Sequence, residues 1–291
     1  MNSVSSNHAQ SLAAGLSRLQ PLLDASNSRI SSGQRIDRPA SDISGVGMAS
    51  KLDGQQARLE AVEVNLQNGM SRSQVATAQL STLSRIVTRL SELSTLQNNP
   101  VQTDATRQLY ATEATELQNQ LRQTIGGTTA EVGGESDVGR PLGVFNGREL
   151  FGSDGGDVIA IGLQSDEKVT LPSVDLRHGA MGLLFQQDGS GNFTFDISDA
   201  GAGSVLNAAL DQLSAGQAEI GAVQSRLELA ASATTTARTN TEAALSSIRD
   251  VDIAQETTTY TRLQILSESY TAMVAQARDA NAKLLPLLNR G

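Results

Sequence analysis

The stretch from Met48 to Leu90, MASKLDGQQARLEAVEVNLQNGMSRSQVATAQLSTLSRIVTRL, contains no proline and repeats its apolar residues in steps of three and four. One series consists of Leu52, Leu59, Leu66, Ser73, Leu80 and Val87, and a second of Met48, Gln55, Val62, Gly69, Ala76, Leu83 and Leu90. Alternating steps of three and four place residues on one stripe of a helix that packs against a partner helix. The stretch therefore predicts a long coiled-coil helix from Ser41 to about Asn99.

The C-terminal part, residues 204–288, has the same pattern. One series consists of Leu206, Leu213, Ile220, Leu227, Thr234, Thr241 and Ile248, and a second of Ala209, Gly216, Val223, Ala230, Ala237, Ala244 and Val251. The second series is mostly small, which allows neighbouring helices to approach closely. A further stripe is expected through Leu263, Leu266, Tyr270, Met273 and Ala277.

Between these regions, the Asn98-Asn99-Pro100 break precedes a second helix predicted for Asp104 to about Thr124. From 126 to 203 glycine recurs, and strand-like alternation occurs at 157–163, 168–171 and 192–197. The first two runs flank a polar connection that suits a hairpin, and the turn sequence at 188–191 leads into the third. The fold class expected is mainly α: a long antiparallel helical, coiled-coil rod formed by both chain ends, with a small β-hairpin insertion in the middle.

Composition excludes several function classes. Tryptophan is absent and aromatic residues make up 3%, so we expect burial along thin seams between helices. The net charge of −9 disfavours nucleic acid and anionic membranes as partners. There is no cysteine, no run of 18 apolar residues and no Sec-type signal peptide at the N-terminus.

The residues that could support catalysis or metal binding are few. Asp250 and Asp252 are two apart, so on one helix they would face different directions, which argues against an acid/base pair. His8 and His178 are the only histidines, and H-E-x-x-H does not occur. The 188–192 segment lacks calcium-loop spacing and is expected to be a turn. We therefore expect no catalytic, metal or cofactor site.

The N-terminal half carries motifs of a known family. Ser28-Arg29-Ile30-Ser31-Ser32-Gly33-Gln34-Arg35-Ile36 resembles the arginine-hydrophobe-Ser-Ser-Gly-x-Arg-Ile signature of bacterial flagellins. The segment Asp37–Gly45 is similar to the N-x-A-K-D-D-A-A-G stretch that follows, with Pro39 and Ser41 departing from it. Asn65–Leu80 resembles a further helical motif, and Phe145-Asn146-Gly147 resembles the family's F-N-G turn.

The C-terminal half resembles the same family in the expected order. Gly221–Leu227 (GAVQSRL) is similar to G-A-V-Q-N-R-F, and Ser247–Ala254 (SIRDVDIA) to S-R-I-x-D-x-D-Y-A. Arg262–Leu266, Val274–Ala277 and Leu284–Leu288 resemble R-x-Q-I-L, L-A-Q-A and V-L-x-L-L. Each motif alone is weak, but their shared order at both ends indicates a flagellin.

The resemblance implies a division of the chain. Residues 1–36 and 251–291 would be inner filament helices, 37–151 and 204–250 would be rod-domain helices, and 152–203 would hold the β-hairpin and variable region. The large outer domains of longer flagellins would be missing. Residues expected to carry assembly are those of the motifs: Arg29, Ser32, Gly33, Arg35, Asp42, Gly45, Gln224, Arg226, Asp250, Asp252, Gln264 and Leu266.

The resemblance also implies partners. They are further copies of the chain in a homopolymer, the flagellar export apparatus, an export chaperone and the filament cap, with an extracellular location reached without a cleaved signal peptide. Arg89, Leu93 and Glu113 fall on the face that resembles the surface bound by the flagellin-sensing Toll-like receptor, although filament packing is the alternative use of that face. The terminal segments are expected to be disordered before assembly.

Two other functions stay open at this stage. A hook–filament junction protein has similar ends, but the G-A-V-Q-S-R and F-N-G motifs favour a flagellin. A helical-hairpin signalling module also uses long antiparallel helices, and the glycine-rich stretch between 126 and 203 opposes it.

Overall fold

The computed structural model describes residues 2–139, 141–152, 155–164 and 166–288, with side chains from 10 to 279 inside these ranges. This part of the chain is mainly helical, with seven helices and two small antiparallel strand pairs, so the expected fold class is confirmed. The side chain of His8 and those of the Leu284–Leu288 motif lie outside the described residues. The chain forms two compact units, one combining residues up to Ala57 with those from Arg238 onward, the other Arg58–Ala237.

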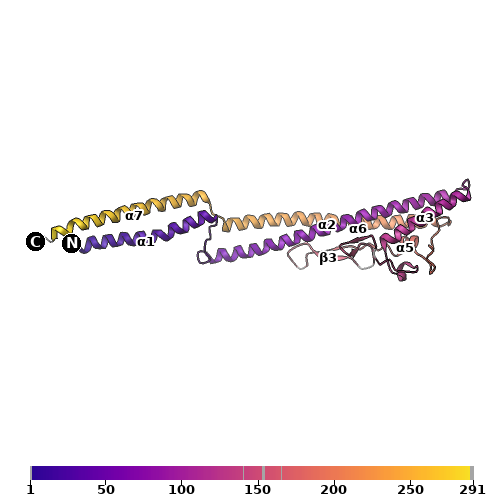
Figure 1. Cartoon of the computed structure of the whole chain (residues 1–291), viewed down its shortest axis with the longest axis horizontal. Coiled ribbons are helices and arrows are strands. Elements are labelled where there is room, and N and C mark those ends of the chain that lie inside the picture. Colours follow the sequence, from indigo (N-terminus) through magenta and orange to yellow (C-terminus); the bar gives the residue numbers. More distant parts are fainter. Residues whose placement is uncertain (1, 140, 153–154, 165, 289–291) are drawn as a thin grey trace. The chain divides into compact units, whose positions relative to one another are not determined.

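In the first unit, α1 (Asn2–Ser32) and α7 (Ile253–Leu288) lie side by side and run in opposite directions (Figure 1). Apart from Ser26, which is fully buried, their most enclosed described side chains are only half-buried. The ring of Tyr270 packs onto Gly15, where an added Cβ would lie 2.7 Å from a ring carbon. Small size at Gly15 therefore lets the two helices approach.

The stripe expected on α7 is partly wrong. Leu266 and Met273 are exposed, whereas Tyr260, Ser267 and Val274 are half-buried together with Leu263, Tyr270 and Ala277. Both stripes satisfy three–four spacing, and the position of α1 selects the one that contains the two tyrosines. Apolar spacing alone does not say which side of a helix its partner covers.

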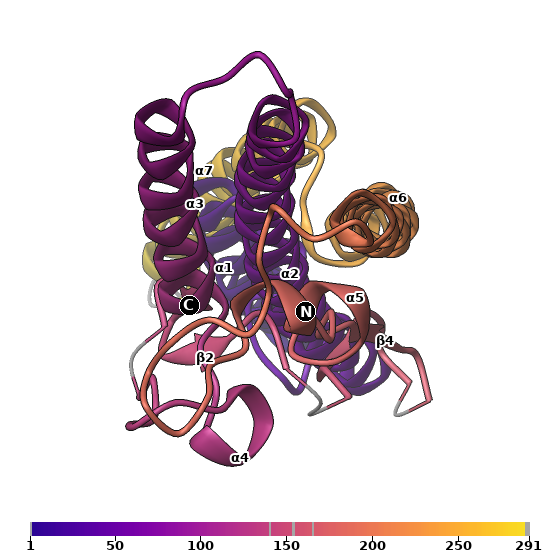
Figure 2. The same cartoon turned by 90° about the vertical axis from the view of Figure 1, so that its right-hand side faces the viewer.

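In the second unit, α2 (Ile43–Gln97) and α6 (Ala202–Arg249), which also extend into the first unit, pack with α3 (Asp104–Ile125). Figure 2, seen along the helices, shows α3 on one side of α2 and α6 on the other. The segment that links α3 to α6 lies beside these three helices. The predicted helix ends lie within two residues of those observed. Within this unit both predicted seams of α2 are buried from Leu59 to Leu90.

The predicted hairpin is confirmed. Strands β3 (Asp157–Ala160) and β4 (Lys168–Leu171) pair antiparallel, with Ile159 opposite Val169. Val169 and Leu171 point into a small cluster formed with Val62 and Leu66 of α2 and with Val223 and Leu227 of α6. A second pair, β1 (Val144–Phe145) and β2 (Arg148–Glu149), closes around Asn146 and Gly147, whose φ angles of 50° and 77° suit a two-residue hairpin turn.

The third alternating run, residues 192–197, is not a strand, and that prediction is wrong. The preceding turn is real, because the Asp188 carboxylate accepts hydrogen bonds from the backbone N–H groups of Ser190 (2.8 Å) and Asn192 (2.9 Å). Beyond it the backbone makes only one isolated bridge, between Gln187 and Phe193. The run instead packs Phe193 and Phe195 against the helical core, and a strand needs a partner along its length.

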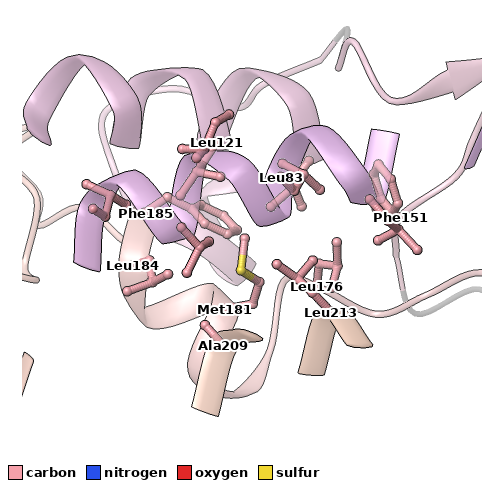
Figure 3. Packing of buried hydrophobic residues seen from close by; sticks show 14 of the residues in the cluster. Leu83, Leu121, Phe151, Leu176, Met181, Leu184, Phe185, Ala209 and Leu213 are labelled. Atoms are coloured by element: carbon pink, nitrogen blue, oxygen red, sulfur yellow. The ribbon is translucent and has the colours of Figure 1, made fainter. Parts of the chain in front are cut away.

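The main core is broader than the thin seams expected from composition. All five phenylalanines of the chain lie between residues 145 and 195, and all of them belong to this core or pack against it. Figure 3 shows Phe151 and Phe185 in one cluster with Leu83 of α2 and Leu121 of α3. Met181, Leu184 and Phe185 come from α5 (Gly179–Phe185), a helix that the sequence pattern did not predict. The middle segment therefore supplies the large side chains that the long helices lack.

Candidate functional site

Eight of the twelve motif residues expected to carry assembly lie at one place in the first unit, where α1 ends and α2 begins beside the end of α6 and the start of α7. We call this place the junction; it comprises residues 33–42 and 249–252 and the adjoining helix ends. Helix α1 ends at Ser32, and the N–H of Gly33 donates to the Arg29 carbonyl (2.9 Å). Gly33 has φ +70°, a left-handed conformation in which glycine is favoured after a helix.

Arg35, which follows α1, hydrogen-bonds the last residues of α6. Its backbone N–H donates to the Arg249 carbonyl (2.6 Å), and its guanidinium donates to the Ile248 carbonyl from Nε (3.0 Å) and Nη2 (2.7 Å). The N–H of Val251 donates to the Gly33 carbonyl (3.0 Å), which completes a short antiparallel bridge. The last carbonyls of a helix have no partner inside it and carry partial negative charge, so a cationic donor there closes α6 favourably.

Two aspartates begin the next helices. The Asp42 carboxylate accepts from the N–H of Gly45 (2.7 Å) at the start of α2, and Asp252 accepts from those of Ala254 (2.9 Å) and Gln255 (3.1 Å) at the start of α7. These are N-cap bonds, which an Asp side chain makes well. Asp42 also pairs with Arg35 at 3.5 Å.

The expectation that Asp250 and Asp252 lie on different faces of one helix is wrong, because the helix breaks between them. Asp250 accepts a hydrogen bond from the Ser246 hydroxyl (2.7 Å), while Asp252 caps α7. An Asp immediately before the Ile253-Ala254 start of a helix is an N-cap signal that the sequence does contain. Both carboxylates accept hydrogen bonds at a helix end, Asp250 from a side chain of α6 and Asp252 from the backbone of α7, and these are structural roles.

Ion pairs extend the junction along the helices. Arg29 of α1 lies 3.3 Å from Glu256 of α7, and Arg249 of α6 lies 3.6 Å from Asp53 of α2. Arg29 also donates from Nε to the Ala25 carbonyl (3.3 Å). The junction is thus a set of hydrogen bonds and ion pairs. It lies where the N-terminal part of the chain passes from α1 to α2 and the C-terminal part passes from α6 to α7.

Four motif residues lie elsewhere. Gln224 and Arg226 lie on α6 in the second unit, with Arg226 exposed, and Gln264 and Leu266 are exposed on α7. Ser32 is at the junction, where its hydroxyl accepts from the Gln34 N–H (3.2 Å). The structure therefore groups Arg29, Gly33, Arg35, Asp42, Gly45, Asp250 and Asp252 with Ser32 and separates the remaining four from them.

A second candidate surface contains Arg89 on α2 and Glu113 on α3. The Arg89 guanidinium donates to both Glu113 oxygens (2.7 and 3.1 Å) and to Glu92 (2.9 Å). Hydrogen bonds from Arg89 lower the pKa of the Glu113 carboxyl, and the two carboxylates raise the pKa of Arg89. Leu93 is fully buried in the main core, so it faces no receptor in this subunit.

The sequence reasoning missed several polar residues of the second unit, of which Gln118 and Arg122 are buried and Gln212 is half-buried. Gln118 of α3 donates to the carbonyls of Leu184 (2.9 Å) and Phe195 (3.0 Å), and Gln212 of α6 accepts from the Met181 N–H (3.0 Å) at the start of α5. Arg122, whose pKa is lowered by burial, donates to the Val132 carbonyl (2.8 Å) beside α4 (Thr129–Val132). No local pattern marks these residues, since their partners are backbone groups ten or more residues away along the chain.

Within the part of the chain that the structure covers, no cluster of three or more His, Cys, Asp or Glu side chains has a metal-binding arrangement. The His178 ring is exposed and lies 2.9 Å from the nearby Asp175 carboxylate. Among the described helices, none combines the length and the apolarity needed to cross a membrane.

Comparison with known proteins identifies the family to which this arrangement of helices belongs. Residues 4–135 match the model of the bacterial flagellin N-terminal helical region, and residues 204–288 match that of the C-terminal helical region. The chain belongs to the bacterial flagellin family. Both matched regions contribute to the junction, and the segment between them holds the hairpins and α5.

Flagellin relatives match nearly the whole chain. It is 30% identical over 266 residues to the "Flagellar filament 30.7 kDa core protein" of Treponema maltophilum, covering 90% of each chain. It is 30% identical over 289 residues to the "Flagellin" of Bacillus subtilis (strain 168), covering 89% of this chain and 90% of that one. With "Flagellin FlaB2" of Treponema pallidum (strain Nichols) it shares 32% over 268 residues, with the same coverage.

Proposed function

We propose that the chain is a structural subunit that self-assembles into the filament of a bacterial flagellum and so serves swimming motility. The observation that carries the proposal is the apolar surface left on the α1–α7 pair. Leu22 of α1 and Ile265, Leu266 and Met273 of α7 keep between 41% and 58% of their surface exposed although the helices are already paired. Further helices are needed to cover these side chains.

Copies of the same chain supply such helices. A contact between different faces of identical subunits whose rotation does not close generates an open helical polymer. The relatives named as flagellar filament core proteins support this use of the terminal helices. The Asp42 and Asp252 carboxylates of the junction serve as helix caps, which supports assembly and not catalysis as the role of the subunit.

Seeded polymerisation tests the proposal. Purified subunit added to short filament fragments should elongate them into long filaments, visible by electron microscopy. Growth that stops after a short ring would indicate the hook–filament junction function instead, which the names of the relatives above do not support. A matched variant with Leu266 and Met273 changed to Ser should elongate several-fold more slowly, because it loses exposed apolar surface without touching the half-buried seam.

We further propose that the filament is extracellular and that the flagellar export apparatus delivers the chain, with an export chaperone and a filament cap. A chain free of cysteine crosses between reducing and oxidising compartments without mispairing, which supports this route. In cells whose export apparatus is inactivated, the subunit should remain inside. Its continued appearance in the medium would contradict the proposed route.

A receptor-binding role for the Arg89–Glu113 surface is a second candidate. The support is the half-exposed ion pair, which presents a planar guanidinium and a carboxylate from two neighbouring helices. In a reporter assay for the flagellin-sensing Toll-like receptor, Arg89→Ala should lower the response, with Arg85→Ala as the matched control on the same helix. Equal responses of Arg89→Ala and the unaltered chain would leave filament packing as the use of this face.

A further inference from the structure

Methionine is the most readily oxidised side chain of this molecule. The chain has five methionines and neither cysteine nor tryptophan, so a peroxide meets no thiol or indole before it meets a thioether. Met48 of α2 and Met273 of α7 are 54% and 42% exposed, and both belong to the first unit. Met181 is fully buried in the main core of the second unit, and Met70 is half-buried against the small cluster. Among the methionines whose side chains are described, the two that solvent reaches freely are therefore those of the first unit.

Met273 lies on the face of α7 that α1 leaves uncovered. It follows Leu266 by about two helical turns, so the two side chains point the same way. Ile265 is exposed beside Leu266, whereas Tyr270 and Val274 lie on the side of α7 that α1 covers and are half-buried. The sulfur of Met273 thus belongs to the apolar surface that assembly is proposed to cover.

Met48 is exposed to a similar degree but has polar surroundings. Its neighbours one turn away on α2 include Ser44 and Lys51, and both are exposed. A more polar sulfur changes little on such a surface. Met48 therefore serves as a matched control, because it offers the same chemistry in the same unit but lies outside the apolar face of α7.

We propose that Met273 is an oxidation site that controls assembly, with hydrogen peroxide as the oxidant. The sulfur lone pair attacks one peroxide oxygen, the S–O bond forms as the O–O bond breaks, and the other oxygen takes up a proton and leaves as water. Sulfur loses the two electrons that the peroxide gains. The product is a sulfoxide, whose oxygen is a hydrogen-bond acceptor, and the apolar neighbours Ile265 and Leu266 offer it no side-chain donor. The inference rests on the proposed filament function, because the modification acts on the contacts that assembly would make.

The oxidation is reversible. A thiol-dependent methionine sulfoxide reductase removes the sulfoxide oxygen as water while two thiols are oxidised to a disulfide. The chain has no cysteine, so the thiols must come from the reductase and its reductant. Met273 can therefore pass between an assembly-competent and an assembly-deficient form without new synthesis of the chain.

Seeded elongation after peroxide treatment tests this control. Unaltered subunit that has been treated with hydrogen peroxide and desalted should elongate about tenfold more slowly than its untreated sample, as expected when one polar group is buried without a partner. Met273→Leu should lose most of this sensitivity and Met48→Leu should keep it, each variant being compared with its own untreated sample. Equal sensitivity of the two variants would overturn the proposal. If the untreated, unaltered subunit does not elongate, it is the filament function that fails.

Peptide mapping by mass spectrometry locates the sulfoxide without any variant. In treated subunit, Met48 and Met273 should gain oxygen before Met70 and Met181, and a sulfoxide reductase with dithiothreitol should restore both the Met273 thioether and the elongation rate. In filaments, Met273 should oxidise at least about tenfold more slowly than in dilute subunit, because neighbouring copies cover it. Equal rates in filament and subunit would place Met273 outside the interface and contradict the proposal, while the filament function would stand. Slow elongation that persists after Met273 has been reduced would contradict it in the same way.

Discussion

At the residue scale, two glycines of α2 that look alike in the sequence differ in what surrounds them. A Cβ on Gly45 would overlap the Asp42 carboxylate that caps α2 and approach Ile36, whereas one on Gly47 would meet nothing within 4 Å. We expect Gly45→Ala to lower the free energy of unfolding by about 1–2 kcal/mol through loss of the cap and crowding. Gly47→Ala should raise it by up to about 1 kcal/mol, because alanine favours a helix.

Urea unfolding of both variants, followed by circular dichroism, checks this pair. Equal effects of the two substitutions would show that the Asp42 cap is not sensitive to its neighbour. The distinction depends on the cap geometry, which the glycine positions in the sequence do not reveal.

The Glu113 carboxyl provides a residue-scale prediction on pH. Its pKa in the folded chain is lowered from 4.5, mainly by the hydrogen bond from Arg89. A lowered folded pKa adds stability above the unfolded pKa, and this stability is lost as pH falls through the folded value. Glu113→Gln should therefore be slightly less stable than the unaltered chain at pH 7, and the difference should shrink as pH falls through the lowered pKa of Glu113.

Urea midpoints measured from pH 7 down to pH 3 test the Glu113 prediction, with Glu116→Gln, exposed on the same helix, as the control. A difference that grows as pH falls would contradict it. The sequence does not predict this ion pair. Arg89 and Glu113 come together only because of the way α3 is aligned along α2.

At the element scale, the sequence predicts what local periodicity determines. The ends of α2, α3 and α6 follow from Asn98-Asn99-Pro100, from the glycines after Ile125 and from unbroken apolar spacing, and the 157–171 hairpin follows from alternation around a polar turn. Residues 192–197 show the limit of the method: they alternate as a strand does, yet Phe193 and Phe195 gain more by packing on the core. Helix α5 is seven residues long, too short for a periodic signal.

Glutamine side chains of α3 and α6 hydrogen-bond the backbone of helix α5, and a prediction at the element scale follows. Gln118 donates to the carbonyls of Leu184 and Phe195 from a fully enclosed position. Gln118→Leu should lower the free energy of unfolding by about 1–3 kcal/mol, because it leaves these two carbonyls without a donor. Gln120→Leu, at an exposed position of α3, is the control for urea unfolding. Similar midpoints for the two variants would mean that α5 does not depend on this bridge.

At the scale of the whole molecule, burial is unevenly distributed between the two units. The second unit contains the main core with its five phenylalanines, whereas Ser26 is the one fully buried residue among the described side chains of α1, and those of α7 up to residue 279 are half-buried or exposed. Ordering a residue costs about 1–2 kcal/mol of backbone entropy, which thin burial repays poorly. The terminal helices therefore depend on neighbours in a way that the second unit does not.

The last prediction follows from this contrast. In dilute subunit, amides of residues 5–30 and of α7 should exchange with solvent within seconds, while those of α2 and α3 in the second unit should be protected. In the filament, the terminal helices should gain protection of at least about a hundredfold, since neighbouring copies would cover Leu22, Leu266 and Met273. Hydrogen exchange with mass spectrometry, on subunit and polymer of the same preparation, measures both states. Strong protection of residues 5–30 in dilute subunit would mean that the α1–α7 pair is stable alone, and that assembly proceeds by docking of folded ends and not by folding on contact.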